Sequence, residues 1–80
     1  MRRVTLLSRP GCHLCEDALA VLEQVSQIIT FKLEIQNIDE IALLYDKYKN
    51  DIPVILLDGE EVGRHRIQKD EIMKILNRAP

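Results

Sequence analysis

The sequence predicts an α/β fold with the element order β-α-β-α-β-β-α, in which a four-stranded mixed sheet is flanked by three helices. One observation is an apolar strand pattern, followed by a long helical pattern and a second strand pattern, which together make a βαβ unit. Another is Asp58-Gly59, a strong hairpin signal between two later strands. A last amphipathic pattern closes the chain. Eighty residues suit one compact domain, so we expect residues 1–80 to form it.

In the first half of the chain, the spacing of apolar residues changes from that of a strand to that of a helix and back. Residues 4–8 read as a buried strand that ends at the turn-forming Arg9-Pro10-Gly11. From Cys12 onward, apolar residues recur at steps of three and four, as in an amphipathic helix: Leu14, Ala18, Leu22, Val25 and Ile29. Residues 31–35 then alternate between apolar and charged side chains, which indicates a half-buried strand with Phe31, Leu33 and Ile35 on its inner face.

The second half predicts a short helix, a hairpin and a final helix. Asp39 is the expected N-cap of the short helix, whose apolar residues are Ile41, Leu44, Tyr45 and Tyr48. Residues 54–57 form a continuous apolar strand, and the hairpin leads into a short strand at 61–63. The last helix begins near Lys69 and runs for about eight to ten residues, with an inward stripe of Ile72, Ile75 and Leu76.

Composition and charge exclude several classes of function. Eleven basic against thirteen acidic residues give a net charge of −2, which argues against nucleic acid as a partner. Apolar runs fall far short of the roughly 18 residues that span a bilayer, so we expect no membrane segment. The basic start is interrupted by Arg9 and Pro10 before it reaches signal-peptide length, which predicts an unexported, cytoplasmic protein.

The two cysteines, Cys12 and Cys15, form a CxxC motif at the predicted carboxyl edge of the sheet. A disulfide between them closes too small a loop to stabilise a fold, so their purpose is chemical. Free amides of the first helical turn favour a thiolate on Cys12, which is therefore the expected nucleophile. Cys15, one turn deeper, is the expected resolving thiol. A CxxC that opens a helix in a βαβ unit is typical of thiol–disulfide exchange.

Two other interpretations of the motif stay open. CxxC is also half of a zinc or iron–sulfur ligand set, but no second CxxC follows, and only His13 and His65 remain as histidine ligands. A metal site would therefore need two chains, and an inert cysteine pair is the other alternative. An imidazolium at His13 would favour the Cys12 thiolate, yet a histidine in an exposed first turn is more often simply solvated.

The segment Arg9-Pro10-Gly11-Cys12-His13-Leu14-Cys15, together with Asp51-Ile52-Pro53-Val54 and Asp58-Gly59, resembles glutaredoxins and the small glutaredoxin-like proteins of the thioredoxin superfamily. The resemblance covers nearly the whole chain and implies a thioredoxin-like (glutaredoxin-type) fold. It also implies a cis Ile52–Pro53 bond beside the redox pair; an ordinary trans proline at a strand start is the alternative. In the family, the backbone of the residue before this proline pairs with substrate, which corresponds to Ile52 here.

The match to the family's glutathione-binding residues is partial. Arg9 stands where the family commonly has a basic residue that meets the glutathione carboxylate, and Gly63 matches the first of its paired glycines. Arg64 replaces the second glycine, and His65 and Arg66 stand where the family usually has a small residue and an acidic one that receive the glutathione amino end. A cation there would repel that ammonium. This basic segment is either a solvated turn or a surface for an acidic protein partner.

The resemblance implies a thiol–disulfide oxidoreductase active in electron transport and cell redox homeostasis. Its expected substrates are protein disulfides or glutathione-mixed disulfides, and a reductase or glutathione would supply electrons. We expect a monomer with no bound metal or cofactor, glutathione being a candidate co-substrate. The alternative function is a thioredoxin-fold carrier that holds a metal or iron–sulfur centre through Cys12.

Overall fold

The computed structural model describes residues 2–77, so residues 1 and 78–80 of the expected domain lie outside the described part. Its elements are β1 (Arg3–Ser8), α1 (His13–Ser26), β2 (Lys32–Asn37), the 3₁₀ helix η1 (Ile38–Glu40), α2 (Ala42–Tyr48), β3 (Val54–Leu57), β4 (Glu60–Arg64) and α3 (Lys69–Asn77). The predicted order β-α-β-α-β-β-α is confirmed, with η1 as an added turn before α2. In this range, no helix combines the length and apolar character needed to cross a membrane.

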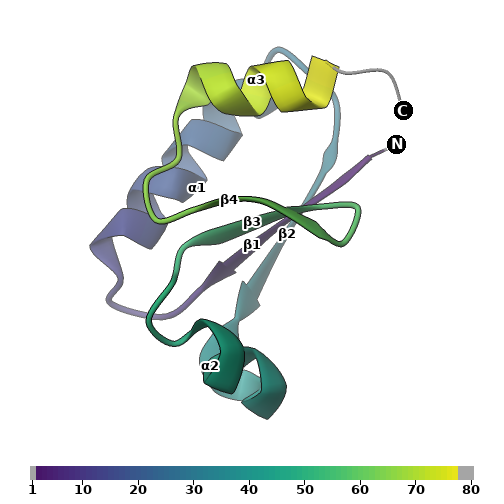
Figure 1. The fold of residues 1–80 in the computed structure, drawn as a ribbon. Helices are drawn as coiled ribbons and strands as arrows, with labels where there is room; N and C mark the ends of the chain where they lie inside the picture. Colours follow the sequence, from purple (N-terminus) through teal and green to yellow (C-terminus); the bar gives the residue numbers. More distant parts are fainter. Residues whose placement is uncertain (1, 78–80) are drawn as a thin grey trace.

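The strands form one mixed sheet in the order β2-β1-β3-β4 (Figure 1). β1 pairs with β2 in parallel, as a helical crossover requires, and β3 runs antiparallel to both β1 and β4. Asp58 and Gly59, which join β3 to β4, both have positive φ angles, 50° and 92°. This is the backbone that a two-residue hairpin turn needs, and the predicted hairpin is confirmed.

Helices cover both faces of the sheet (Figure 1), and the buried side chains form a separate apolar core on each face. α1 and α3 share one face, where the buried side chains are Val4, Leu6, Ala18, Leu22, Val25, Phe31, Ile55, Leu57, Ile72 and Leu76. η1 and α2 cover the other face over a smaller core of Leu7, Ile38, Tyr48 and Val54. The alternation of inward side chains along β1 therefore supplies both layers.

Two residues expected on inner faces are exposed instead. Leu14, in the first turn of α1, is 38% exposed because it lines an open groove with Ile67 and Gln68 at the end of the helix. Ile35 is 53% exposed because β2 is an edge strand, and this part of it borders an open cavity. Apolar periodicity identifies the inner face of an element but not how far its neighbours extend over that face.

The prediction for the second helix was wrong in its cap and in including Ile41, which precedes α2. Asn37 caps η1 by accepting the Asp39 N–H at 2.9 Å, and α2 starts after Ile41 with no side-chain cap. Asparagine is as good an N-cap as aspartate, so the turn begins two residues earlier than expected. α2 has only seven residues and turns one narrow stripe, Leu44 and Tyr48, toward the core, which leaves Ile41 and Tyr45 exposed.

We expect Asp58→Asn to remove part of the acid sensitivity of folding. Asp58 Oδ1 accepts the Arg3 backbone N–H at 2.9 Å and Oδ2 the Arg2 Nε–H at 3.3 Å; these bonds, the backbone bond first, lower the Asp58 pKa below its ordinary 3.8. A lowered native-state pKa adds stability above the unfolded-state pKa, and this stability is lost as the pH falls through the native-state value. Urea unfolding should show that wild type is more stable than the variant at neutral pH, and that the two free energies of unfolding converge below pH ~3.

The asparagine of this variant can still accept the Arg3 N–H through its amide oxygen and tolerates a positive φ, so the substitution isolates the charge from the turn. Hydrogen bonds from Arg64 also lower the pKa of Glu61. Because Glu61 is present in both proteins, its contribution to the pH dependence cancels in the comparison. A stability difference that stays constant across this pH range would contradict the assignment.

Candidate active site

Strand pairing brings the predicted site residues to one edge of the sheet. β1 ends at Ser8, which pairs with Asn37 at the end of β2. Leu7 pairs with Val54 at the start of β3, and Val54 in turn pairs with Arg64 at the end of β4. The loop that carries Cys12 therefore lies at the same edge as Ile52-Pro53, the 64–66 segment and η1.

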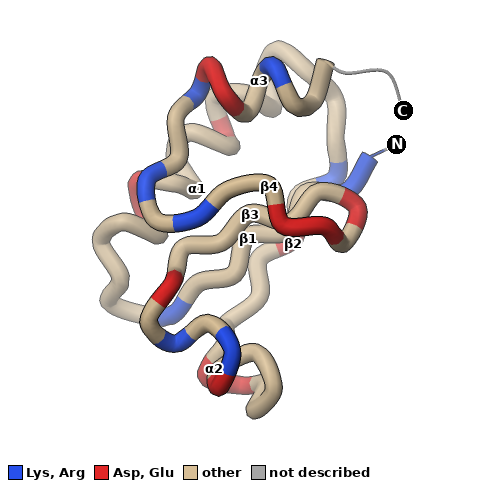
Figure 2. The backbone as a smooth tube through the Cα atoms, viewed as in Figure 1, with Lys and Arg blue, Asp and Glu red and all other residues tan. Residues whose placement is uncertain are grey.

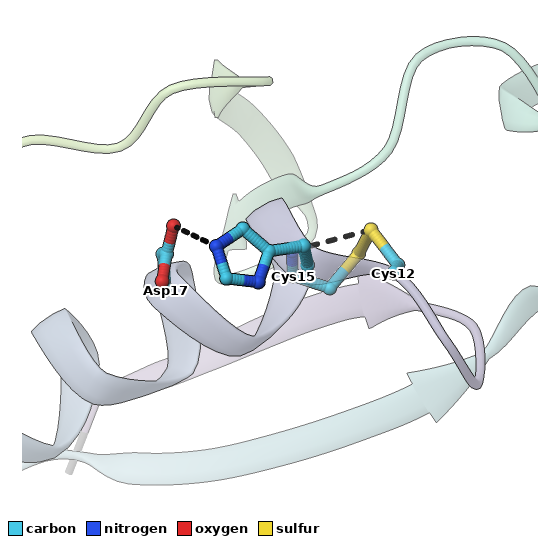
Figure 3. The surroundings of a disulfide bond; sticks show 4 residues. Cys12, Cys15 and Asp17 are labelled. Carbon is cyan, nitrogen blue, oxygen red and sulfur yellow. Dashed lines mark hydrogen bonds and ion pairs between the residues drawn. A yellow bond between two sulfur atoms is a disulfide. The ribbon is translucent and has the colours of Figure 1, made fainter.

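Cys12 and Cys15 form a disulfide at the start of α1, with Cα atoms 5.2 Å apart (Figure 3). Cys12 is the N-cap of the helix, and its Sγ accepts the backbone N–H of Cys15 at 3.2 Å. Cys12 is half-buried, whereas Cys15 is 4% exposed and packs under the first turn. Only Cys12 therefore offers its sulfur to a large substrate, and an amide donor is in place for the thiolate that reduction would leave there.

His13 projects into solvent from the first turn of α1, as expected from the sequence. Its side chain is 84% exposed, and Nε2 lies 3.7 Å from Asp17 Oδ2 (Figure 3). Exposed pairs of this kind contribute little energy. The contacts thus favour a solvated histidine, and a role in substrate binding stays a prediction.

The Ile52–Pro53 peptide is cis, in agreement with the resemblance. Pro53 is buried, and its carbonyl accepts the His65 N–H at 2.7 Å, which ties the entrance of β3 to the end of β4. Across residues 2–77, no hydrogen bond uses the backbone N–H or C=O of Ile52. The binding role of Ile52 and Pro53 stays a prediction.

Carboxylates neutralise much of the positive charge of the basic segment at the end of β4, residues 64–66. Arg64 makes two hydrogen bonds to Glu61, at 2.6 and 2.7 Å, and lies 3.5 Å from Asp51. The Glu61 hydrogen bonds raise the Arg64 pKa, and His65 Nε2 is 3.2 Å from the same Asp51. Figure 2 shows the acidic start of β4 and the basic loop that follows it. Of the three, only Arg66 has no ion pair within the described chain, so the segment is closer to a braced turn than to a cationic patch.

Gly63 lies inside β4, opposite Ile55. A Cβ at this position would be 3.4 Å from Ile67 Cδ1, an ordinary contact. The glycine is therefore not required by close packing, and its predicted role in binding glutathione stays untested.

Arg9 has partners that the sequence did not reveal. Its Nη2 lies 3.1 Å from Asp39 Oδ1, and its Cζ is 5.7 Å from the centre of the Tyr45 ring. Asp39 and Tyr45 follow Arg9 by thirty and more residues, so no local pattern links them. The one available signal was topological, because the segment after β2 must reach the same sheet edge as the loop after β1.

A cavity of about 270 Å³ lies beside the disulfide on the β2 side, lined by Leu6, Ser8, Arg9, Pro10, Gly11, Cys12, Cys15, Glu16, Leu19, Ile35 and Asn37. Ile52, Pro53, His13 and Gly63 do not line it. The predicted residues thus fall into two groups, with Arg9 and the cysteines at the cavity and the others outside it. Within residues 2–77, no three His, Cys, Asp or Glu side chains gather as a metal site, so a metal centre would need ligands from a second chain.

Comparison with known proteins assigns the family. A model of the Glutaredoxin-like domain (DUF836) matches residues 3–77. The chain belongs to this glutaredoxin-like family. It is 32% identical over 75 residues to the Glutaredoxin-like protein YDR286C homolog of Dictyostelium discoideum, covering 86% of this chain and 69% of that protein.

Solved structures give the same fold. The solution structure of Ne2328 from Nitrosomonas europaea is 31% identical, with a TM-score of 0.83, covering 95% of this chain and 92% of that one. The X-ray structure of XcR50 from X. campestris is 28% identical, with a TM-score of 0.80, covering 96% and 99%. A mutant thioredoxin from Halobacterium salinarum, 19% identical with a TM-score of 0.71 over 94% and 71% of the two chains, shows the shared fold alone. This glutaredoxin-like chain therefore has the predicted thioredoxin-like fold, and its CxxC pair fits a redox function.

Proposed function

We propose that this glutaredoxin-like domain is a thiol–disulfide oxidoreductase that reduces protein disulfides and mixed disulfides. The Cys12 thiolate attacks one sulfur of the substrate disulfide, forms a mixed disulfide and releases the first substrate thiolate. Cys15 then loses its proton and attacks Cys12 Sγ, which forms the Cys12–Cys15 disulfide and releases the second thiolate. Two electrons pass from the dithiol to the substrate, the thiolates take up protons, and a reductase or two glutathione thiols restore the dithiol.

The observation that carries the proposal is the position of Cys12 Sγ at the start of α1. It accepts the Cys15 N–H, stands at an accessible edge and is close enough to bond with a buried second sulfur. Hydrogen bonding to the charged form of a group lowers its pKa, so Cys12 can react as a thiolate near neutral pH. Burial disfavours charge on Cys15 until a mixed disulfide forms beside it.

The free backbone groups of Ile52 support a polypeptide substrate. An extended segment on either side of a substrate cysteine can hydrogen-bond to this N–H and C=O, and main-chain pairing is largely indifferent to side chains. The domain would then act on disulfides in exposed, extended segments of several proteins.

The function is tested by stoichiometric exchange. The reduced protein, with two titratable thiols per chain, is mixed with a peptide that carries a small thiol in disulfide linkage. We expect one peptide thiol to be released for each Cys12–Cys15 disulfide formed, well above the rate with buffer alone. Thiol release no faster than the uncatalysed background would refute the proposal, and a coloured dimer that bleaches on chelation would favour a metal or iron–sulfur carrier instead.

A further inference from the structure

Arg9 is the cation closest in sequence to the reactive sulfur, and it lines the cavity that Cys12 and Cys15 also line. Of the residues that line this cavity, Arg9 is the one basic residue and Glu16 the one acidic residue, so Arg9 is the cation available to an anionic group on a substrate that binds there. The guanidinium already has a carboxylate partner, because Asp39 Oδ1 lies 3.1 Å from Nη2, and the Tyr45 ring lies beneath it.

Local structure holds Asp39 in this position. Asn37 Oδ1 accepts the Asp39 N–H and starts the 3₁₀ turn that carries the carboxylate toward the loop after β1. The Arg9 and Asp39 side chains are 37% and 36% exposed, so both groups of the pair are accessible to solvent and to a charged group dissolved in it. Asp39 and Tyr45 also line a neighbouring hollow of about 510 Å³, which Glu40 and Asp46 make acidic.

We propose that Asp39 is a specificity-determining residue, which by pairing with Arg9 selects against disulfides that carry a carboxylate next to the reacting sulfur. The inference rests on the proposed function. A substrate carboxylate would have to displace Asp39 from the Arg9 guanidinium or lie close to the negatively charged Asp39 carboxylate. A neutral group on the substrate meets neither obstacle. Disulfides in neutral or basic polypeptide segments are then the favoured substrate class, and disulfides that carry a carboxylate beside the reacting sulfur are reduced more slowly.

The test uses two probes that differ in charge and hardly in shape. One cysteine peptide is linked by a disulfide to 3-mercaptopropionate, and the same peptide is linked to 3-mercaptopropionamide. The second-order rate constant for reduction is measured with each probe. For wild type, we expect the rate constant with the amide probe to exceed that with the carboxylate probe, so that the amide-to-carboxylate ratio is above one. Asp39→Asn should lower this ratio about two- to fivefold, the size expected of a solvent-exposed charge pair.

Glu40→Gln is the matched control, because it removes one negative charge from the same turn. Glu40 is exposed and has no ion pair within residues 2–77, so its replacement should move the ratio by less than the Asp39 variant does. In an Arg9→Gln background, Asp39→Asn should lose most of its effect, and high salt should shrink the wild-type ratio.

The outcomes separate this inference from the proposed function. An unchanged ratio in Asp39→Asn, or an equal shift in Glu40→Gln, overturns the role of Asp39 while reduction of the amide probe still supports the oxidoreductase. Failure of the wild type to reduce either probe overturns both.

Discussion

Cys12→Ser should lower disulfide exchange to the uncatalysed background, whereas Cys15→Ser should still attack its substrate and remain joined to it. A serine hydroxyl cannot replace the thiolate that forms at the N-terminus of α1, because its pKa is far too high for nucleophilic attack near neutral pH. Without Cys15, by contrast, the first half-reaction is intact and the second has no internal nucleophile. Mass spectrometry after mixing with a peptide disulfide should show one adduct on Cys15→Ser and none on Cys12→Ser.

The two variants control for each other, since each makes the same substitution and each removes the same disulfide. Any loss of stability from the missing cross-link is therefore shared, and circular dichroism checks that both fold. Equal adduct formation in the two variants, or an adduct on Cys15 in Cys12→Ser, would contradict the assigned roles.

Cys15→Ser also isolates the ionisation of Cys12. Position 15 keeps its backbone N–H, so we expect the variant to retain this donor for Cys12 Sγ. Thiolate absorbance followed against pH should show Cys12 ionising at lower pH than a cysteine in a short peptide. Ionisation at the peptide's pH would remove the physical basis of the nucleophile.

Most of the fold could be predicted because its signals are local. The αβ alternation, Asp58-Gly59 and the stripe of α3 each lie within a short stretch of chain, and each is confirmed. The errors concern burial, which depends on elements that are distant in the sequence. Ile35 and Leu14 obey their periods, but whether another element covers them depends on tertiary packing.

The candidate site divides in the same way. A four-residue motif and a strand–helix junction suffice to place Cys12 and Cys15 at the carboxyl edge. Asp39, the partner of Arg9, and Asp51, a second partner of Arg64, lie far from them along the chain, and neither pair has a periodic signal. The other partner of Arg64, Glu61, is only three residues away. Asp39 illustrates the limit, because it looks like a helix cap in sequence, while Asn37 caps the turn and Asp39 faces Arg9 instead.

The second large effect is on stability: Leu22→Ala should cost about 3 to 5 kcal/mol of unfolding free energy. Leu22 is fully buried in the core between α1 and the sheet, where lost burial and a residual cavity both destabilise. A chain of 80 residues has roughly 4 to 12 kcal/mol in total, so the variant should lose a large share of it. Urea unfolding should show a lower midpoint, and the melting temperature should fall by more than about 10 °C.

Leu43→Ala is the matched control, because it makes the same substitution in a helix at a side chain that is 82% exposed. It should change stability by less than about 0.5 kcal/mol. Both proteins are compared in the oxidised form, so the Cys12–Cys15 bond contributes equally. A comparable loss in both variants would contradict the placement of Leu22 in the core that fixes α1, the helix that carries the cysteines, to the sheet.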